Sequence, residues 1–149
     1  MVETRAVIQR VNRCEVTVAD RVLSRTGIGL LVLFGVAQGD GDKELEYIAD
    51  KTLNLRVFPD DEGKMNLSVL DVAGELTVVS QFTLLADTRK GRRPSFVSAA
   101  DPVVAEPIYE RFVERLRASG VLVGTGGFGE MMLVSLDNWG PVTIVIDSP

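Results

Sequence analysis

A Gly-Pro pair set between two stretches with strand composition constrains the fold more than any other feature of this chain. Gly140-Pro141 follows the apolar run 131–136 and precedes the β-branched run 142–146. Proline has no N–H to donate to a sheet and its φ is fixed, so it is confined to strand edges, bulges and turns. General turn statistics favour a tight turn that joins two strands. The alternative is a backbone, with a cis bond at Pro141, that is presented to a bound molecule.

The apolar pattern predicts one α+β domain over residues 1–149, a length typical of a single domain with a sizeable core. The segment from Arg5 to Val18 is rich in β-branched residues and is followed by a turn at 19–21, which predicts an amino-terminal hairpin. The apolar run 30–36 predicts a strand buried on both faces. Further short strands are expected over 56–58, 78–84 and 121–123. The predicted architecture is a mostly antiparallel β-sheet with a barrel-like core and two main helices.

Both helices are predicted from apolar residues at helical spacing. The first covers 42–56, with Asp42 as its N-cap. The second covers about 103–117, but Pro107 then falls inside it. Because an interior proline removes a helix hydrogen bond, a start nearer Glu106 is the alternative.

The chain contains no histidine and one cysteine, which removes most familiar catalytic designs. Ser-His-Asp and Cys-His systems, histidine zinc sites and thiolate-rich sites are all excluded. No spacing of Asp and Glu resembles a Mg²⁺ or Ca²⁺ loop, so neither a metal nor another cofactor is expected. Cys14 cannot form an internal disulfide, which fits a reducing compartment, and we expect it to pack as a small residue in a strand.

Hydropathy and charge limit the cellular location and the binding partners that we expect. No apolar window is long enough to cross a bilayer and the amino terminus lacks a signal-like apolar core, so we expect a cytoplasmic protein without a membrane partner. The net charge of -5 argues against broad binding along nucleic-acid backbones, because that affinity grows with the number of phosphates neutralised. Any such contact must be local. The one dense basic segment, 89–93, is by itself typical of a solvated loop.

Several short motifs occur together along the chain. They are Val7-Ile8-Gln9-Arg10-Val11, Gly63-Lys64-Met65-Asn66, Ser80-Gln81-Phe82-Thr83-Leu84, Ala86-Asp87-Thr88, Gly91, Arg93-Pro94-Ser95-Phe96, Val134-Ser135-Leu136, Asn138 and Gly140-Pro141-Val142-Thr143. This set closely resembles the D-aminoacyl-tRNA deacylases, over essentially the whole chain and without departure in the matched motifs.

The resemblance implies hydrolysis of the ester that joins a D-amino acid to the terminal ribose of a tRNA. It also implies action on mischarged glycine, which has no side chain for a chirality filter to reject. Members of the family are homodimers in which the Gly-Pro of one subunit reaches the pocket of the other, so Gly140 and Pro141 are the expected chirality filter. The expected catalytic segment is Ser80, Gln81, Phe82 and Thr83.

Ester cleavage without histidine needs another source of rate acceleration. An aminoacyl ester is already activated, so orientation and electrostatic stabilisation of the oxyanion can suffice. We expect backbone N–H groups around Gln81 and Phe82 to stabilise the oxyanion, while the neighbouring ribose hydroxyl helps to activate water. Thr83 either lines the site or is a nucleophile. The second role needs an activating base, for which Lys90 and Asp87 are the nearest candidates along the chain.

Chiral selection by Gly140-Pro141 has a geometric rationale. If both carbonyl oxygens project toward the substrate α-carbon, they hold its amino group and leave no room for an L side chain, which makes the range of D-substrates broad. Arg10 is expected to support these carbonyls through its donor fork, with a surface ion pair as the alternative. The residues expected to line or support the pocket are Arg10, Phe128, Met132 and Asn138, of which Phe128 and Met132 face the terminal adenosine. The residues expected to contact tRNA phosphates are Arg89, Lys90, Arg92 and Arg93.

Two other classes of function remain open. One is a non-catalytic dimeric module that binds RNA 3′ ends, which would share the pocket and the basic segment but not the turnover. The other is an esterase or peptidase that uses Thr83 or Ser80 as its nucleophile, and the lack of an evident base is the main objection to it.

Overall fold

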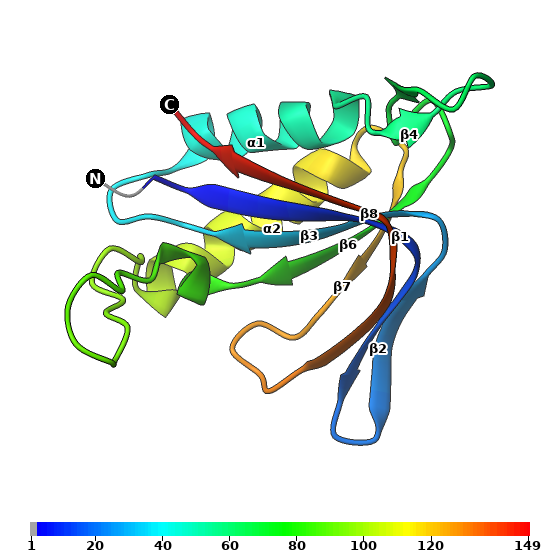
Figure 1. Ribbon diagram of the computed structural model, residues 1–149. Coiled ribbons are helices and arrows are strands. Elements are labelled where there is room, and N and C mark those ends of the chain that lie inside the picture. The colour runs from blue at the N-terminus through cyan, green and yellow to red at the C-terminus, as the bar shows by residue number, and fades with distance from the viewer. Residues whose placement is uncertain (1–2) are drawn as a thin grey trace.

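A curved sheet with both helices on one face forms the body of the protein (Figure 1). The structure is a computed structural model and describes residues 3–149. Its elements are β1 (Arg5–Val18), β2 (Arg21–Thr26), β3 (Gly29–Gly35), α1 (Asp42–Asn54), β4 (Phe58–Pro59), β5 (Met65–Leu67), β6 (Glu75–Ser80), η1 (Phe82–Leu85, a single 3-10 turn), α2 (Pro102–Arg117), β7 (Leu122–Thr125) and β8 (Leu133–Asp147). The six-stranded sheet has the order β2-β1-β3-β6-β7, and β8 pairs with β1 outside this path.

The long strand β1 organises the sheet. It pairs antiparallel with β2 through residues 14–18, with β3 through 5–11, and with β8 between 5 and 17. The pairs β3–β6 and β6–β7 are parallel. The predicted α+β architecture, the amino-terminal hairpin and the buried strand near 30–36 are therefore confirmed, and β7 confirms a short strand near 121–123.

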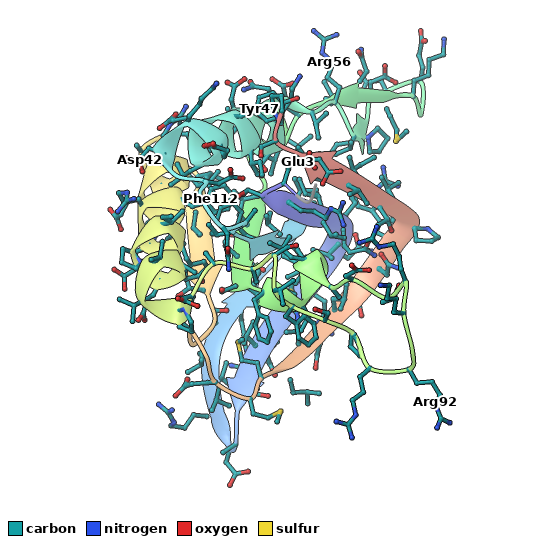
Figure 2. The ribbon with its side chains drawn as sticks, turned by 90° about the vertical axis from the view of Figure 1, so that its left-hand side faces the viewer. Glu3, Asp42, Tyr47, Arg56, Arg92 and Phe112 are labelled. Carbon is teal, nitrogen blue, oxygen red and sulfur yellow. The ribbon has the colours of Figure 1, made fainter. Side chains whose placement is uncertain are left out.

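The core occupies both faces of the sheet. On the helical side, Phe34 of β3 stacks on Phe112 of α2 with ring centroids 4.0 Å apart, and both side chains are almost completely buried. Figure 2 shows Phe112 between the helical layer and the sheet. A smaller cluster on the opposite face includes Cys14, Val79 and Val134, so the prediction that Cys14 packs in a strand is confirmed.

The cap of α1 differs from the prediction. Gly41 is the N-cap, and its N–H donates to the Glu44 carboxylate at 3.2 Å. Asp42 is instead the first helical residue, where its charge complements the helix dipole and pairs with Arg111 of α2 at 2.8 Å. The predicted N-cap is wrong by one residue, and the helix ends at Asn54 rather than at residue 56.

Helix α2 tolerates its interior proline. The helix begins at Pro102, so the alternative start nearer Glu106 is wrong. Pro107 leaves only the carbonyl of Val103 without its helical donor, and Val103 is 86% exposed, where water can supply the missing bond. Within residues 3–149, neither helix has the length and apolar character that crossing a membrane requires.

The strand predicted over 78–84 ends early. β6 stops at Ser80 and the chain turns into η1. At Gln81 the N–H still follows the β3–β6 ladder and donates to the Phe34 carbonyl at 2.8 Å, but the Gln81 carbonyl accepts from the Leu84 N–H at 3.2 Å. The second bond closes the turn, so Phe82 and Thr83 do not continue the strand.

The Gly-Pro pair lies in the middle of one continuous strand, so its interpretation as a turn between two strands is wrong. Gln9 pairs with Thr143 and Val11 pairs with Asn138, which leaves the four residues 139–142 opposite the single residue Arg10. This bulge removes Pro141 from the ladder and with it the need for an N–H donor. The peptide bond between Gly140 and Pro141 is cis, as the alternative interpretation expected.

Candidate active site

A cavity of about 500 Å³ lies where β6 ends and η1 begins. The first turn of α2 and the loop that leads into β8 complete its walls. Five of the predicted site residues line it: Ser80, Gln81, Phe82, Phe128 and Met132. Residues about 50 positions apart in the chain thus share one mainly apolar cavity, which is the usual form of a small-molecule site.

The hydrogen bonds around Gln81 reduce the number of backbone N–H groups that are free to stabilise an oxyanion. Because the Gln81 N–H already donates to the Phe34 carbonyl, it is not available to a substrate. Within residues 3–149 the Phe82 N–H has no backbone acceptor outside η1, as expected for the first residue of a helical turn. Phe82 therefore carries the donor that remains for the predicted role.

Within residues 3–149, the hydrogen bond that reaches the Thr83 hydroxyl comes from a donor and not from a base. This exposed hydroxyl accepts a hydrogen bond from the side-chain amide of Gln81, which is a donor and not a base. The Asp87 carboxylate is engaged by the Arg89 guanidinium at 2.7 and 2.9 Å, and this hydrogen bonding lowers the pKa of Asp87 to about 2. A carboxylate with such a pKa is a weak base, so it is a poor activator for a threonine nucleophile.

Arg10 lies in the middle of β1 and is only 8% exposed. Its Nη1 donates to the Val57 carbonyl at 2.7 Å and its Nε donates to the Trp139 carbonyl at 3.1 Å. No carboxylate within residues 3–149 forms an ion pair with it, so the surface ion pair is wrong. Its donor fork instead connects β1 to the bulge and to the chain before β4.

The bulge presents Gly140 and Pro141 on the surface. Both residues are exposed, and Gly140 has a φ of +119°. A Cβ on Gly140 would lie 2.8 Å from Arg10 Nη2, so the backbone here approaches the guanidinium closely. Asn138, the residue before the bulge, accepts a hydrogen bond from Gln9 Nε2 at 2.8 Å. Neither Gly140 nor Pro141 lines the cavity of its own chain.

The basic segment forms an ordered loop beyond η1. Two backbone hydrogen bonds between Asp87 and Ser95, at 2.7 and 2.9 Å, close its base. Arg89 is paired with Asp87, whereas Lys90, Arg92 and Arg93 are exposed and have no ion pair within residues 3–149. Figure 2 shows Arg92 at the outer end of this loop, pointing away from the body. The loop is therefore a local cationic surface on an acidic protein.

Sequence reasoning missed Gly35, the last residue of β3. It lines the cavity, and a Cβ there would lie 2.7 Å from the Gln81 carbonyl oxygen. The only available signal was a glycine at the end of a buried apolar run. Elsewhere, no group of three or more His, Cys, Asp or Glu side chains that could hold a metal ion occurs in the part of the chain that the structure describes.

One family model and several curated proteins match this chain over nearly its whole length. The family model described as D-Tyr-tRNA(Tyr) deacylase matches residues 7–147. A curated protein of Roseiflexus sp. (strain RS-1), named D-aminoacyl-tRNA deacylase, is 56% identical over 97% of this chain and 93% of its own length. A protein of the same name from Clostridioides difficile (strain 630) is 53% identical over 97% of each chain.

Solved structures give the same fold. A structure named "c-Myc DNA Unwinding Element Binding Protein" superposes with a TM-score of 0.92 at 44% identity, covering 97% of this chain and 99% of the other. A structure described as a probable eukaryotic D-amino acid tRNA deacylase superposes with a TM-score of 0.85 over 98% of this chain and 100% of the other. At 19% identity, the second likeness concerns the fold alone.

Proposed function

Because the chain belongs to the D-Tyr-tRNA(Tyr) deacylase family, we propose that it hydrolyses the ester bond of D-aminoacyl-tRNA, and of mischarged glycyl-tRNA, to free tRNA and amino acid. The observation that carries the proposal is the match to named deacylases at 53–57% identity over nearly the whole chain. The cavity at the end of β6 supports it, because the matched Ser80-Gln81-Phe82 motif lines that cavity.

The proposed chemistry needs no side-chain base. Water attacks the ester carbonyl carbon, the carbonyl oxygen becomes an oxyanion, and the bond to the ribose oxygen then breaks, with the proton passing to the ribose. The Phe82 N–H stabilises the oxyanion and the neighbouring ribose hydroxyl orients the water. The occupied Gln81 N–H and the unactivated Thr83 hydroxyl support this assignment over a covalent mechanism.

A second copy of the chain supplies the chirality filter in this proposal. Gly140 and Pro141 are exposed on the bulge and lie outside the cavity of their own chain, so a site that contains both needs a partner subunit. Their carbonyls bind the substrate ammonium and exclude an L side chain. Arg10 fixes the bulge by donating from Nε to the Trp139 carbonyl.

The terminal adenosine occupies the apolar end of the cavity. Phe128 packs beside the Tyr109 ring with centroids 6.0 Å apart, and Met132 lies on the same wall. Tyr109 is a support and not an acid or base: its hydroxyl donates to the Val78 carbonyl at 2.7 Å, and burial raises its pKa to about 12. Aromatic and thioether surfaces suit the flat face of a nucleobase.

Replacing Thr83 by alanine is expected to lower kcat by no more than about tenfold, because Thr83 lines the site without attacking the substrate. Loss of a catalytic nucleophile costs about a millionfold in well-studied hydrolases. Single-turnover hydrolysis of a D-aminoacyl-tRNA separates the two outcomes. Near-complete loss of turnover with tRNA binding retained would establish Thr83 as the nucleophile and contradict the proposed chemistry.

Replacing Lys90, Arg92 and Arg93 together by alanine is expected to weaken tRNA binding and to flatten its salt dependence. Three lost phosphate contacts change the slope of log K against log salt by about 2, since each contact to a single strand contributes about 0.7. Binding titrations at several salt concentrations measure this. Arg89→Ala is the matched control and should change the slope less, because Asp87 already neutralises Arg89. An unchanged slope in the triple variant would remove the loop from the tRNA site.

One assay tests the function itself. Purified protein is incubated with matched D- and L-aminoacyl-tRNAs, and release of amino acid is measured. Comparable hydrolysis of several unrelated D-aminoacyl-tRNAs, with the L-forms spared, supports the proposal. Binding of tRNA without hydrolysis of either form would favour the RNA 3′-end-binding module instead.

A further inference from the structure

The side chain of Trp139 lies against the guanidinium of Arg10. The Arg10 Cζ atom lies 4.3 Å from the centroid of the Trp139 ring, and the same ring packs at a tilt of 50° beside Phe58, 6.2 Å between centroids. Trp139 therefore touches Arg10 twice, through its ring and through its backbone carbonyl, which accepts from Nε. A side-chain substitution removes the first contact and leaves the second.

The buried charge of Arg10 makes the ring contact important. The side chain is 8% exposed and has no ion pair within residues 3–149, although burying a charge without a partner is costly. The Val57 and Trp139 carbonyls compensate part of this cost. The electron-rich face of the indole is the remaining compensating group, and a cation–π contact is strongest when desolvated.

Arg10 is also the group that contacts the bulge from the sheet. The four residues 139–142 lie opposite Arg10 alone, so the regular ladder does not fix them. Arg10 Nε holds the Trp139 carbonyl, and Nη2 lies so close to Gly140 that a Cβ there would be 2.8 Å away. The position of the Gly140-Pro141 backbone thus depends on the position of this guanidinium.

We propose that Trp139 is a positioning residue for chiral discrimination: its indole fixes the Arg10 guanidinium, which in turn fixes the Gly140-Pro141 backbone. The inference rests on the proposed function, in which this backbone contacts the substrate. Trp139 also borders a hollow of about 420 Å³, together with Phe58, Ile28 and Val72, so its replacement opens an existing space.

The test compares Trp139→Leu with Trp139→Phe, which keeps an aromatic face. We expect Trp139→Leu to lower the ratio of D- to L-aminoacyl-tRNA hydrolysis about tenfold, through kcat on the D-substrate and not KM, while Trp139→Phe retains most of the ratio. Tyr47→Leu is the matched control, because it removes the ring of the Lys51–Tyr47 cation–π pair on α1 and should leave the ratio unchanged. An unchanged ratio in a folded Trp139→Leu variant would overturn the inference.

A second readout does not depend on catalysis. In the wild type, the Arg10 Nε–H bonded to the Trp139 carbonyl should be protected from solvent exchange, and Trp139→Leu should reduce this protection because the guanidinium loses the indole that keeps it against that carbonyl. If the wild type fails to hydrolyse D-aminoacyl-tRNA, the proposed function is wrong. The exchange rate of the Arg10 Nε–H still shows in that case whether Trp139 positions Arg10. Exchange protection of the Arg10 Nε–H as strong in Trp139→Leu as in the wild type would refute the positioning role of Trp139 even in a working enzyme.

Discussion

Gly140→Ala is expected to lower the rate of D-aminoacyl-tRNA hydrolysis by about a hundredfold, the usual cost of displacing a positioning group by about 1 Å. The added Cβ would lie 2.8 Å from Arg10 Nη2 and 3.0 Å from Val142 Cγ2, and the φ of +119° is unfavourable for alanine. Either the bulge backbone or the Arg10 guanidinium that contacts it therefore has to shift. Single-turnover kinetics with a D-aminoacyl-tRNA measures the effect.

Gly120→Ala is the matched control for the cost of placing alanine at a positive φ. Gly120 has a φ of +92° at the end of α2, and a Cβ there would meet nothing within 4 Å. We expect this variant to lose about 1 to 2 kcal/mol of stability and to keep its activity. Wild-type turnover in Gly140→Ala would show that the bulge backbone does not contact the substrate.

Gly35→Ala is also expected to lower kcat by about a hundredfold, because it displaces the peptide between Gln81 and Phe82 at the cavity. Its Cβ would lie 2.7 Å from the Gln81 carbonyl oxygen. That carbonyl and the Phe82 N–H belong to one planar peptide unit, so displacing the oxygen also displaces the proposed oxyanion donor. Rates under saturating substrate measure the effect, and the affinity for tRNA should persist because the basic loop is unchanged.

Gly41→Ala controls for the loss of a glycine alone. Gly41 has a φ of -156°, and a Cβ there would meet nothing within 4 Å, so full activity is expected. If Gly35→Ala also keeps a wild-type kcat, the Phe82 peptide is not part of the catalytic machinery.

Mixing the Gly140→Ala and Gly35→Ala proteins tests whether the filter acts between subunits. After random exchange half of the dimers are mixed, and each mixed dimer combines one intact cavity with one intact Gly-Pro from the other chain. Activity should return to about a quarter of the wild-type value. No recovery, with subunit exchange verified, would mean that the filter acts within its own chain.

The elements that local pattern alone determines could be predicted. The apolar run of β3, the β1–β2 hairpin and the two amphipathic helices carry their own periodicity or turn signals. The end of β6 could not, because the Gln81 carbonyl that closes the η1 turn lies close to Gly35 of β3, 46 positions away along the chain. In the sequence, the Gly-Pro pair of the β8 bulge looks the same as a Gly-Pro pair in a turn. Only the pairing of β8 with β1 on both sides of the pair distinguishes a bulge from a turn.

The candidate site shows the same division. A motif of consecutive residues such as Ser80-Gln81-Phe82 can be found from the sequence alone. In the structure it lines one cavity together with Phe128 and Met132. The burial of Arg10 could not be inferred, since arginine is usually exposed and its partners, Val57 and Trp139, come from distant segments. The role of Gly35 depends likewise on a close approach between two chain segments.

The bulge also bears on how such a protein can change. Strand β8 is anchored to β1 on both sides of it, at Ile144 opposite Ile8 and at Leu136 opposite Cys14. Between these anchors only residues 139–142 lie outside the regular pairing, so a substitution there can alter the bulge while the register of β8 is kept. Loss of the proposed filter and loss of the fold are therefore separable, because a variant of the bulge can keep the same scaffold and still differ in how it discriminates between substrates.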